Sequence, residues 1–169
     1  MAAALNASNP VRVLLAHPRL ATFVCVIAAG TVTAQGLLRD HPRLPGQGPA
    51  YAAGVVTVAA NLGVQALLLA IIRRLLRRRG HAWISGLQGW EAVALLSVAT
   101  LAASGLLLAG AGSGAVRFQA LLPWFPAVTF ACALALGAVL DQGRRRAWQW
   151  SLVLLFGVQF AIGLVVRLV

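Results

Sequence analysis

Five long apolar blocks, separated by arginines, constrain this chain more than any other feature. They are Leu20–Leu38, Ala50–Ile72, Trp90–Gly110, Leu121–Leu140 and Ala147–Leu168. Each is close to the roughly 20 apolar residues that a membrane-spanning helix needs. Only 10% of the 169 residues are charged, which is too few to cover a water-soluble surface. We therefore predict an all-α polytopic membrane protein, a single membrane domain of five transmembrane helices over residues 1–169.

The arginines predict the orientation of these helices. With five spans, ten arginines fall on the side of the N-terminus and four on the other side. The ten are Arg12, Arg19, Arg73, Arg74, Arg77, Arg78, Arg79, Arg144, Arg145 and Arg146, and the four are Arg39, Arg43, Arg117 and Arg167. Because basic residues near span ends favour the cytoplasm, we expect the N-terminus inside and the C-terminus outside. The composition, rich in alanine and free of lysine, indicates a bacterium and hence its inner (plasma) membrane.

The net charge of +11 is typical of nucleic-acid binding, but a membrane domain offers no soluble module to carry it, so we expect no nucleic-acid partner. Anionic lipid headgroups on the cytoplasmic side are the expected partners of the arginines. The candidate lipid or partner patch is Arg73, Arg74, Arg77, Arg78 and Arg79. The alternative interpretation of this cluster is a stop-transfer signal.

The first apolar block has a second interpretation. Val32-Thr33-Ala34 has the small-residue spacing of a signal-peptidase site. The leader before the apolar run is long, which favours a retained span. Cleavage would leave the orientation of the other four spans unchanged, so the charges do not decide between the two.

Polar residues inside the spans are costly and need an explanation. The candidate polar face is Thr57, Asn61 and Gln65, which are four residues apart on the second span. Further polar residues are Ser97, Thr100 and Ser104 on the third span, Thr31 and Gln35 on the first, and Gln159 on the fifth. They predict either hydrogen bonds between helices or a polar path for a substrate.

Acidic residues are rare, and each lies near a span end. Glu91, the candidate ionisable residue, lies in the first turn of the third span, where a capping role or a salt bridge to a loop arginine explains it. Asp40 lies in a turn-rich loop with no visible partner.

No metal-ligand or catalytic motif is present in the sequence. The histidines His17, His41 and His81 are scattered over different loops, and Cys25 and Cys132 lie inside apolar blocks as small hydrophobic residues. We therefore expect no metal, no cofactor and no enzymatic activity. A lipid-modifying enzyme that uses His17, His81 or Glu91 at the cytoplasmic interface is the third alternative.

Small residues recur every four positions on three spans, which lets helix backbones approach closely. The sets are Ala59 and Gly63, then Ala127, Ala131 and Ala135, then Gly157 and Ala161. They favour a non-enzymatic scaffold or accessory subunit that packs against other membrane subunits or against itself. The alternative is a small oligomeric transporter or channel that uses Thr57, Asn61 and Gln65.

Three stretches of the chain also resemble the Yip-domain family, five-span membrane proteins that interact with Rab GTPases and have bacterial relatives. The stretches are Asn9-Pro10, Arg79-Gly80-His81-Ala82-Trp83 and Leu121–Arg146. The resemblance implies a bundle with a cytoplasmic N-terminus and a role in organising the bilayer. It implies no catalytic residues.

Overall fold

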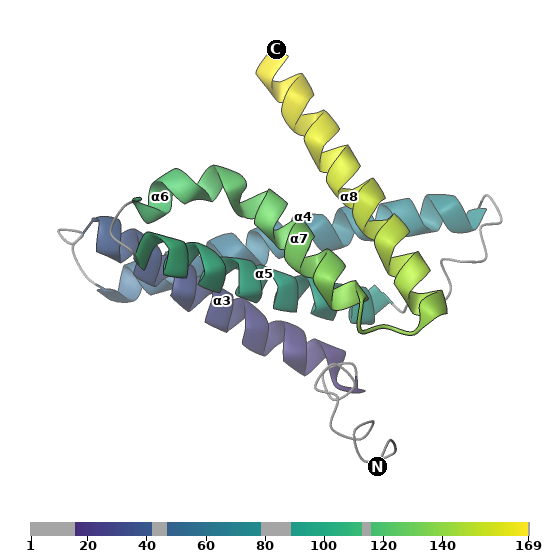
Figure 1. Cartoon of the computed structure of the whole chain (residues 1–169), viewed down its shortest axis with the longest axis horizontal. Coiled ribbons are helices and arrows are strands. Elements are labelled where there is room, and N and C mark those ends of the chain that lie inside the picture. The colour runs from purple at the N-terminus through teal and green to yellow at the C-terminus, as the bar shows by residue number, and fades with distance from the viewer. Residues whose placement is uncertain (1–15, 42–46, 79–88, 113–115, 169) are drawn as a thin grey trace.

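The computed structural model describes residues 16–41, 47–78, 89–112 and 116–168, with the side chains of residues 47 and 162–168 left out. All regular structure in these residues is helical, which confirms the all-α prediction (Figure 1). The elements are α3 (Pro18–Asp40), α4 (Gln47–Arg78), α5 (Gly89–Gly112), α6 (Phe118–Leu121), the short 3₁₀ helix η2 (Leu122–Trp124), α7 (Phe125–Gly137) and α8 (Gln142–Leu168).

Four segments of the described chain are long and apolar enough to cross a bilayer. They are Pro18–Asp40, Gly48–Arg78, Gly89–Gly112 and Phe118–Gly137. The chain is therefore a multi-pass membrane protein, as predicted. The fourth segment begins and ends three residues earlier than predicted. The fifth predicted span lies within α8, a helix of 27 residues, but partly on side chains outside the described set, so this span stays a prediction.

Helix α5 lies at the centre of the bundle and contacts α3, α4, α6 and α7. It is apolar on all sides, which is typical of a helix surrounded by protein. Ser97, Thr100 and Ser104 donate to backbone carbonyls of their own helix at 2.8–2.9 Å. Two of them also contact α3, since Thr33 donates to Ser104 at 3.5 Å and Ser97 has a side-chain hydrogen bond with Cys25.

Helices α3 and α4 cross at a pair of glycines. A Cβ atom on Gly30 would overlap the Cα atom of Val55, and one on Gly54 would lie 2.5 Å from the carbonyl oxygen of Gly30. The two backbones are thus in direct contact, which only glycine permits at this point. Neither glycine belongs to the small-residue repeats on the second, fourth and fifth predicted spans.

The fourth span is not one continuous helix, because Pro123 and Pro126 interrupt its hydrogen-bond ladder. Each proline lacks the N–H that would reach the carbonyl four residues earlier. Those carbonyls instead accept from the N–H groups three residues on, those of Leu122 and Phe125. The result is the sequence α6–η2–α7, with the 3₁₀ turn at the break.

Asp40 fastens this broken span to α3, so the prediction of an unpartnered loop residue is wrong. Asp40 is the last residue of α3, and its carboxylate accepts the backbone N–H groups of Phe118 and Gln119 at 3.2 and 2.7 Å. These N–H groups open α6, where a carboxylate is favoured by the free donors and the helix dipole. Arg39 donates to the carbonyl oxygen of Gly112 at 3.3 Å at the same end.

Helix α8 is held to the bundle by Trp148. The indole of Trp148 is fully buried, and its N–H donates to the carbonyl oxygen of Ala133 in α7 at 2.7 Å. Gly137 makes room for the ring, since a Cβ there would lie 2.6 Å from the Trp148 Cδ1 atom. Leu152 and Leu155 extend this buried face.

Beyond Leu155, no described residue of α8 is buried, and the helix stands away from the others at a steep angle (Figure 1). Helices α3, α4, α5 and α7 thus form the core, and α8 crosses it (Figure 1). The loop 138–141, the Trp148 contact and the packing of Phe156 against Phe130 join α8 to α7 between its start and its middle, and α8 also contacts α4.

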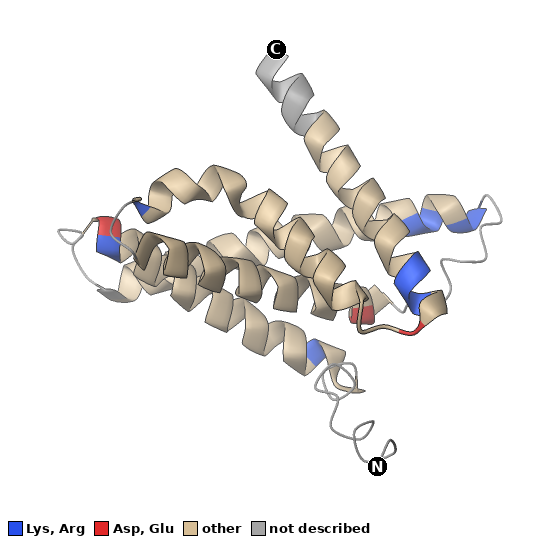
Figure 2. Ribbon diagram, in the orientation of Figure 1, with Lys and Arg blue, Asp and Glu red and all other residues tan. Residues whose placement is uncertain are grey.

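Charged residues of the described chain lie at the two ends of the core, and the described helix segments between those ends contain none (Figure 2). The end that holds the start of α3, the end of α4 and the start of α8 is here called the basic end. Its described arginines are Arg19, Arg73, Arg74, Arg77, Arg78, Arg144, Arg145 and Arg146, whereas Arg39 and Arg117 lie at the opposite end. Arg19 lies over the exposed Trp90 ring at 5.4 Å from its centroid. Charged ends with an apolar belt between them are the pattern of a membrane-spanning bundle.

Candidate functional site: a polar cleft between α4, α7 and α8

The predicted polar face on α4 spirals across the boundary between surface and core. Thr57 is exposed, Asn61 is half-buried, and Gln65 is buried with 3% of its surface exposed. A step of four residues on a helix turns about 40° past a full turn, so such a row drifts around the axis. Asn61 and Gln65 therefore come together in one cleft, whereas Thr57 does not line it.

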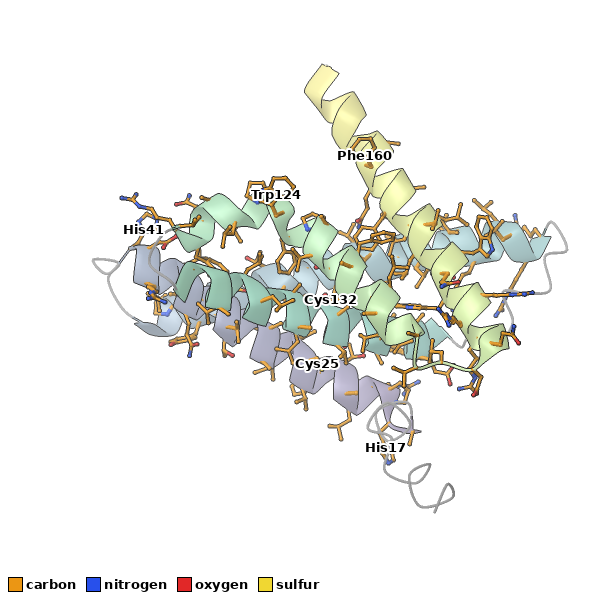
Figure 3. All side chains as sticks on the ribbon, in the orientation of Figure 1. His17, Cys25, His41, Trp124, Cys132 and Phe160 are labelled. Atoms are coloured by element: carbon orange, nitrogen blue, oxygen red, sulfur yellow. The ribbon has the colours of Figure 1, made fainter. Side chains whose placement is uncertain are left out.

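The cleft lies where α8 diverges from α7. Its volume is about 780 Å³, within the usual range for small-molecule sites. Trp124 beside the α6–α7 break and Phe160 on α8 lie on its two sides (Figure 3). The full lining is Asn61, Gln65, Pro123, Trp124, Phe125, Pro126, Ala127, Phe130, Phe156, Gln159 and Phe160.

Aromatic side chains account for five of the eleven lining residues. Phe130 of α7 and Phe156 of α8 meet edge to face, with ring centroids 5.0 Å apart, and close the narrow end between the two helices. Trp124 and Phe160 are 65% and 75% exposed. In a bilayer, such side chains face lipid, so the cleft opens sideways to the hydrocarbon.

The oxygen of the Gln65 amide is the unusual atom of the site. It is buried, and it accepts no hydrogen bond from any described residue. A buried carbonyl oxygen without a donor costs about 1–3 kcal/mol. Proteins keep such groups where something else supplies the partner.

The Asn61 and Gln65 amides lie deep in the membrane. Asn61 is twelve residues from Pro49 at one end of the apolar part of α4 and twelve from Arg73 at the other. Each distance corresponds to about 18 Å along a helix, so Asn61 lies near the middle of a hydrocarbon core of about 30 Å. Gln65 lies one turn closer to the basic end.

The sequence missed most of this wall. Gln159 stood alone on its span, and the structure brings it to the two amides of α4. The run Pro123-Trp124-Phe125-Pro126, near the start of the fourth predicted span, forms one side of the cleft. Two prolines around two aromatic residues in the first half of a span are a usable signal for a broken helix beside a site.

None of the described side chains that line the cleft is ionisable. Amides donate and accept hydrogen bonds, and aromatic rings supply flat apolar surfaces. This arrangement suits reversible binding of a neutral molecule. It offers no group that would transfer a proton.

The second candidate site, the arginine cluster, lies at the basic end. Arg73, Arg74, Arg77 and Arg78 line a hollow of about 500 Å³ together with Ala70 and Gly89, whereas Arg79 falls outside the described residues. Arg73 itself is buried, with 6% of its surface exposed. The remaining arginines project along an α4 that is 32 residues long, or about 48 Å, and so extend beyond the hydrocarbon.

Glu91 joins the helices at this end. Its carboxylate lies 3.7 Å from the guanidinium of Arg144 at the start of α8. The salt bridge predicted for Glu91 is thus present. It ties the first turn of α5 to α8.

The other titratable and sulfur-bearing residues do not assemble a site. Within residues 16–41, 47–78, 89–112 and 116–161, no three His, Cys, Asp or Glu side chains come together to hold a metal ion. His17 and His41 lie at opposite ends of α3, and His81 falls outside the described residues. Cys25 is buried and Cys132 half-buried, both as free thiols.

Comparison with known proteins adds no relative. No family model, no curated protein and no solved structure matches the chain.

Proposed function

We propose that this chain is a non-enzymatic integral membrane protein, a scaffold or accessory subunit that associates through its helices with other membrane subunits or with itself. The observation that carries the proposal is the position of the small-residue faces. Ala59, Gly63, Ala127, Ala131, Ala135, Gly157 and Ala161 are all exposed. The close helix contacts inside the chain use other glycines.

Both glycines on these faces have room for a partner. A Cβ atom on Gly63 or on Gly157 would meet no described atom of another residue within 4 Å. Lipid chains fill a notched helix surface less well than a second helix does, so such faces favour helix association. The exposed apolar belt around them keeps the association within the membrane.

Gly63→Leu tests this proposal. The larger side chain is expected to weaken self-association or subunit binding by about tenfold or more, because it blocks close backbone approach. The measurement is native mass spectrometry of the protein released from its own membrane, with dilution in nanodiscs to obtain the affinity. Val64→Leu, at a neighbouring exposed position, is the control that adds bulk outside the small-residue face. A wild-type protein that remains a lone monomer, or equal behaviour of both variants, contradicts the proposal.

The proposed orientation places the basic end in the cytoplasm of a bacterial cell. The excess of arginines at that end supports it, because short basic segments are retained on the cytoplasmic side. In this orientation, the hollow at the end of α4 faces anionic headgroups. The fifth span proposed for α8 then carries the C-terminus to the other side.

The Yip-like role is part of the proposal as a bilayer-organising function. It rests on the resemblance of Leu121–Arg146, which includes α7 and the start of α8. The stretches at Asn9-Pro10 and at Arg79–Trp83 lie outside the described residues.

A second candidate function is a small transporter or channel, which the cleft with Asn61 and Gln65 favours. Its uncharged wall indicates a neutral solute. Asn61→Leu is then expected to abolish glycerol-driven swelling of proteoliposomes without lowering expression. Gln35→Leu, which removes an exposed amide on α3, is the control. Equal swelling rates for wild type and Asn61→Leu rule this candidate out.

A further inference from the structure

We propose that the cleft between α4, α7 and α8 binds a neutral ring lipid that carries hydroxyl groups, of the prenylated hydroquinone type, with Gln65 accepting one of its hydroxyl protons. The proposal goes beyond a scaffold function and does not depend on it. The exposed small-residue faces and the cleft are separate features, although Ala127 borders both.

The first argument is the unpartnered oxygen of Gln65. Gln65 lines the cleft with 3% of its surface exposed, and its amide oxygen is buried and has no donor within the described chain. A ligand group that pairs with this oxygen must carry an O–H or N–H donor. A hydrocarbon chain supplies none, so lipid tails filling the cleft would leave the oxygen unpaired.

Depth excludes charged headgroups. Asn61 and Gln65 lie near the middle of the apolar part of α4, about 12–18 Å along the helix from Arg73. A phosphate at this depth would lose its hydration, and no cationic residue lines the cleft to replace it. The ligand must therefore have a polar group that is neutral and enters the hydrocarbon readily.

The wall favours a ring over a chain. Two prolines and the aromatic side chains of Trp124, Phe125, Phe130, Phe156 and Phe160 surround the amides. Flat rings stack on such surfaces, in offset or edge-to-face geometry. The volume of about 780 Å³ accommodates a substituted ring together with part of a prenyl tail, which would leave through the lateral opening.

The spacing of the two amides on α4 suits two hydroxyl groups on one ring. Asn61 and Gln65 are one helical turn apart, which is about 6 Å along the axis. This spacing is close to the distance between the two para oxygens of a hydroquinone. Each amide both donates and accepts, so each can pair with a hydroxyl group. Gln159 adds a third amide from α8.

The test is equilibrium binding of tritiated 2-decylhydroquinone, kept reduced with ascorbate, to the full chain in phosphatidylcholine nanodiscs. Empty nanodiscs give the background. We expect saturable binding to wild type and an affinity lower by about tenfold in Gln65→Leu, because the hydroxyl then has no acceptor. Gln35→Leu, which removes an exposed amide on α3, is expected to bind as wild type does.

Folding is followed in the same samples. Leucine is close to glutamine in size and removes the unpaired oxygen, so Gln65→Leu is expected to melt at or above the wild-type temperature without ligand. A lower melting temperature would mean that Gln65 has a structural partner within the protein, and this would overturn the proposal.

Three further probes identify the ligand class. The dimethyl ether of decylhydroquinone keeps the ring and lacks the donors, and it is expected to bind at least about tenfold more weakly. Farnesol and dioctanoylglycerol carry hydroxyls without a ring, and weaker binding of both supports the ring assignment. Absence of saturable hydroquinone binding, equal binding by Gln65→Leu, or tighter binding of farnesol or dioctanoylglycerol overturns it. Binding by Gly63→Leu is expected to equal that of wild type, so the outcome is independent of the association test.

Discussion

Replacing Gly30 with leucine is expected to separate α3 from α4 and to lower the free energy of unfolding by at least about 3 kcal/mol, the upper end of ordinary overpacking. The expected loss of stability is large because the atoms that would clash with the leucine side chain belong to the backbone of α4. Even the first added carbon would overlap the Cα atom of Val55, and a backbone atom within a helix has no rotamer into which it can move. The variant relieves the clash only by moving one whole helix.

The measurement is unfolding in mixed micelles with increasing dodecyl sulfate, followed by tryptophan fluorescence. Gly63→Leu is the matched control, because it makes the same change at a glycine in an apolar span where nothing lies within 4 Å. We expect the control to unfold at the wild-type detergent fraction when the protein is dilute. If Gly30→Leu also unfolds there, the crossing of α3 and α4 at this glycine is wrong.

Replacing Trp148 with alanine is the second change with a large expected effect. It removes the largest fully buried side chain and its hydrogen bond to Ala133. In water, truncating a buried tryptophan costs about 3–5 kcal/mol. Within a bilayer the transfer part is smaller, since lipid is also apolar, but the cavity and the lost contacts remain. We expect a loss of about 3 kcal/mol and detachment of α8 from α7.

Trp148→Phe separates the two contributions. It keeps most of the ring and loses the N–H, so a loss of about 1 kcal/mol is expected. Trp150→Ala serves as the control, since Trp150 is 57% exposed on the same helix. Detachment of α8 is measured with a pair of spin labels at positions 136 and 161. The distribution of distances between the two labels is expected to broaden in Trp148→Ala. An unchanged distance with unchanged stability would falsify the role given to this indole.

The membrane class and the helix positions could be predicted from sequence because both depend on local composition. An apolar block of bilayer length between arginines has few alternatives, and the predicted blocks lie within the helices α3, α4 and α5. The salt bridge of Glu91 was predictable for the same reason, since a carboxylate in a first helical turn near basic loops has few other partners.

The arrangement of the helices could not be predicted from the same patterns. Repeats of small residues occur at Gly63 and Gly157, which are open, while the true crossing at Gly30 and Gly54 belonged to no motif that was singled out. Close approach depends on which faces meet, and this is a property of the whole bundle. Asp40 is a further example, because its partners lie 78 and 79 residues away in the chain.

The candidate site was half predictable. The spacing of Asn61 and Gln65 identified them from one helix alone, but the drift of a four-residue repeat carried Thr57 out to the surface. The other half of the wall depends on two tertiary features, the break at Pro123 and the direction of α8. Neither follows from periodicity within a single span.

The hydrogen bonding of the α5 hydroxyl groups has a consequence for the order in which the helices dissociate on unfolding. Since Ser97, Thr100 and Ser104 donate to their own helix, the surface that α5 presents to α3 and α7 holds mainly by steric fit. Dispersion forces are short in range, and a gap of about 0.5–1 Å already forfeits a quarter to a half of them. Helix α5 contacts α3, α4 and α7. A gap that opens between α5 and one of these helices therefore also weakens the packing of α5 against the other two. The core should thus dissociate as one cooperative unit, while α8, attached at one half, is free to leave first.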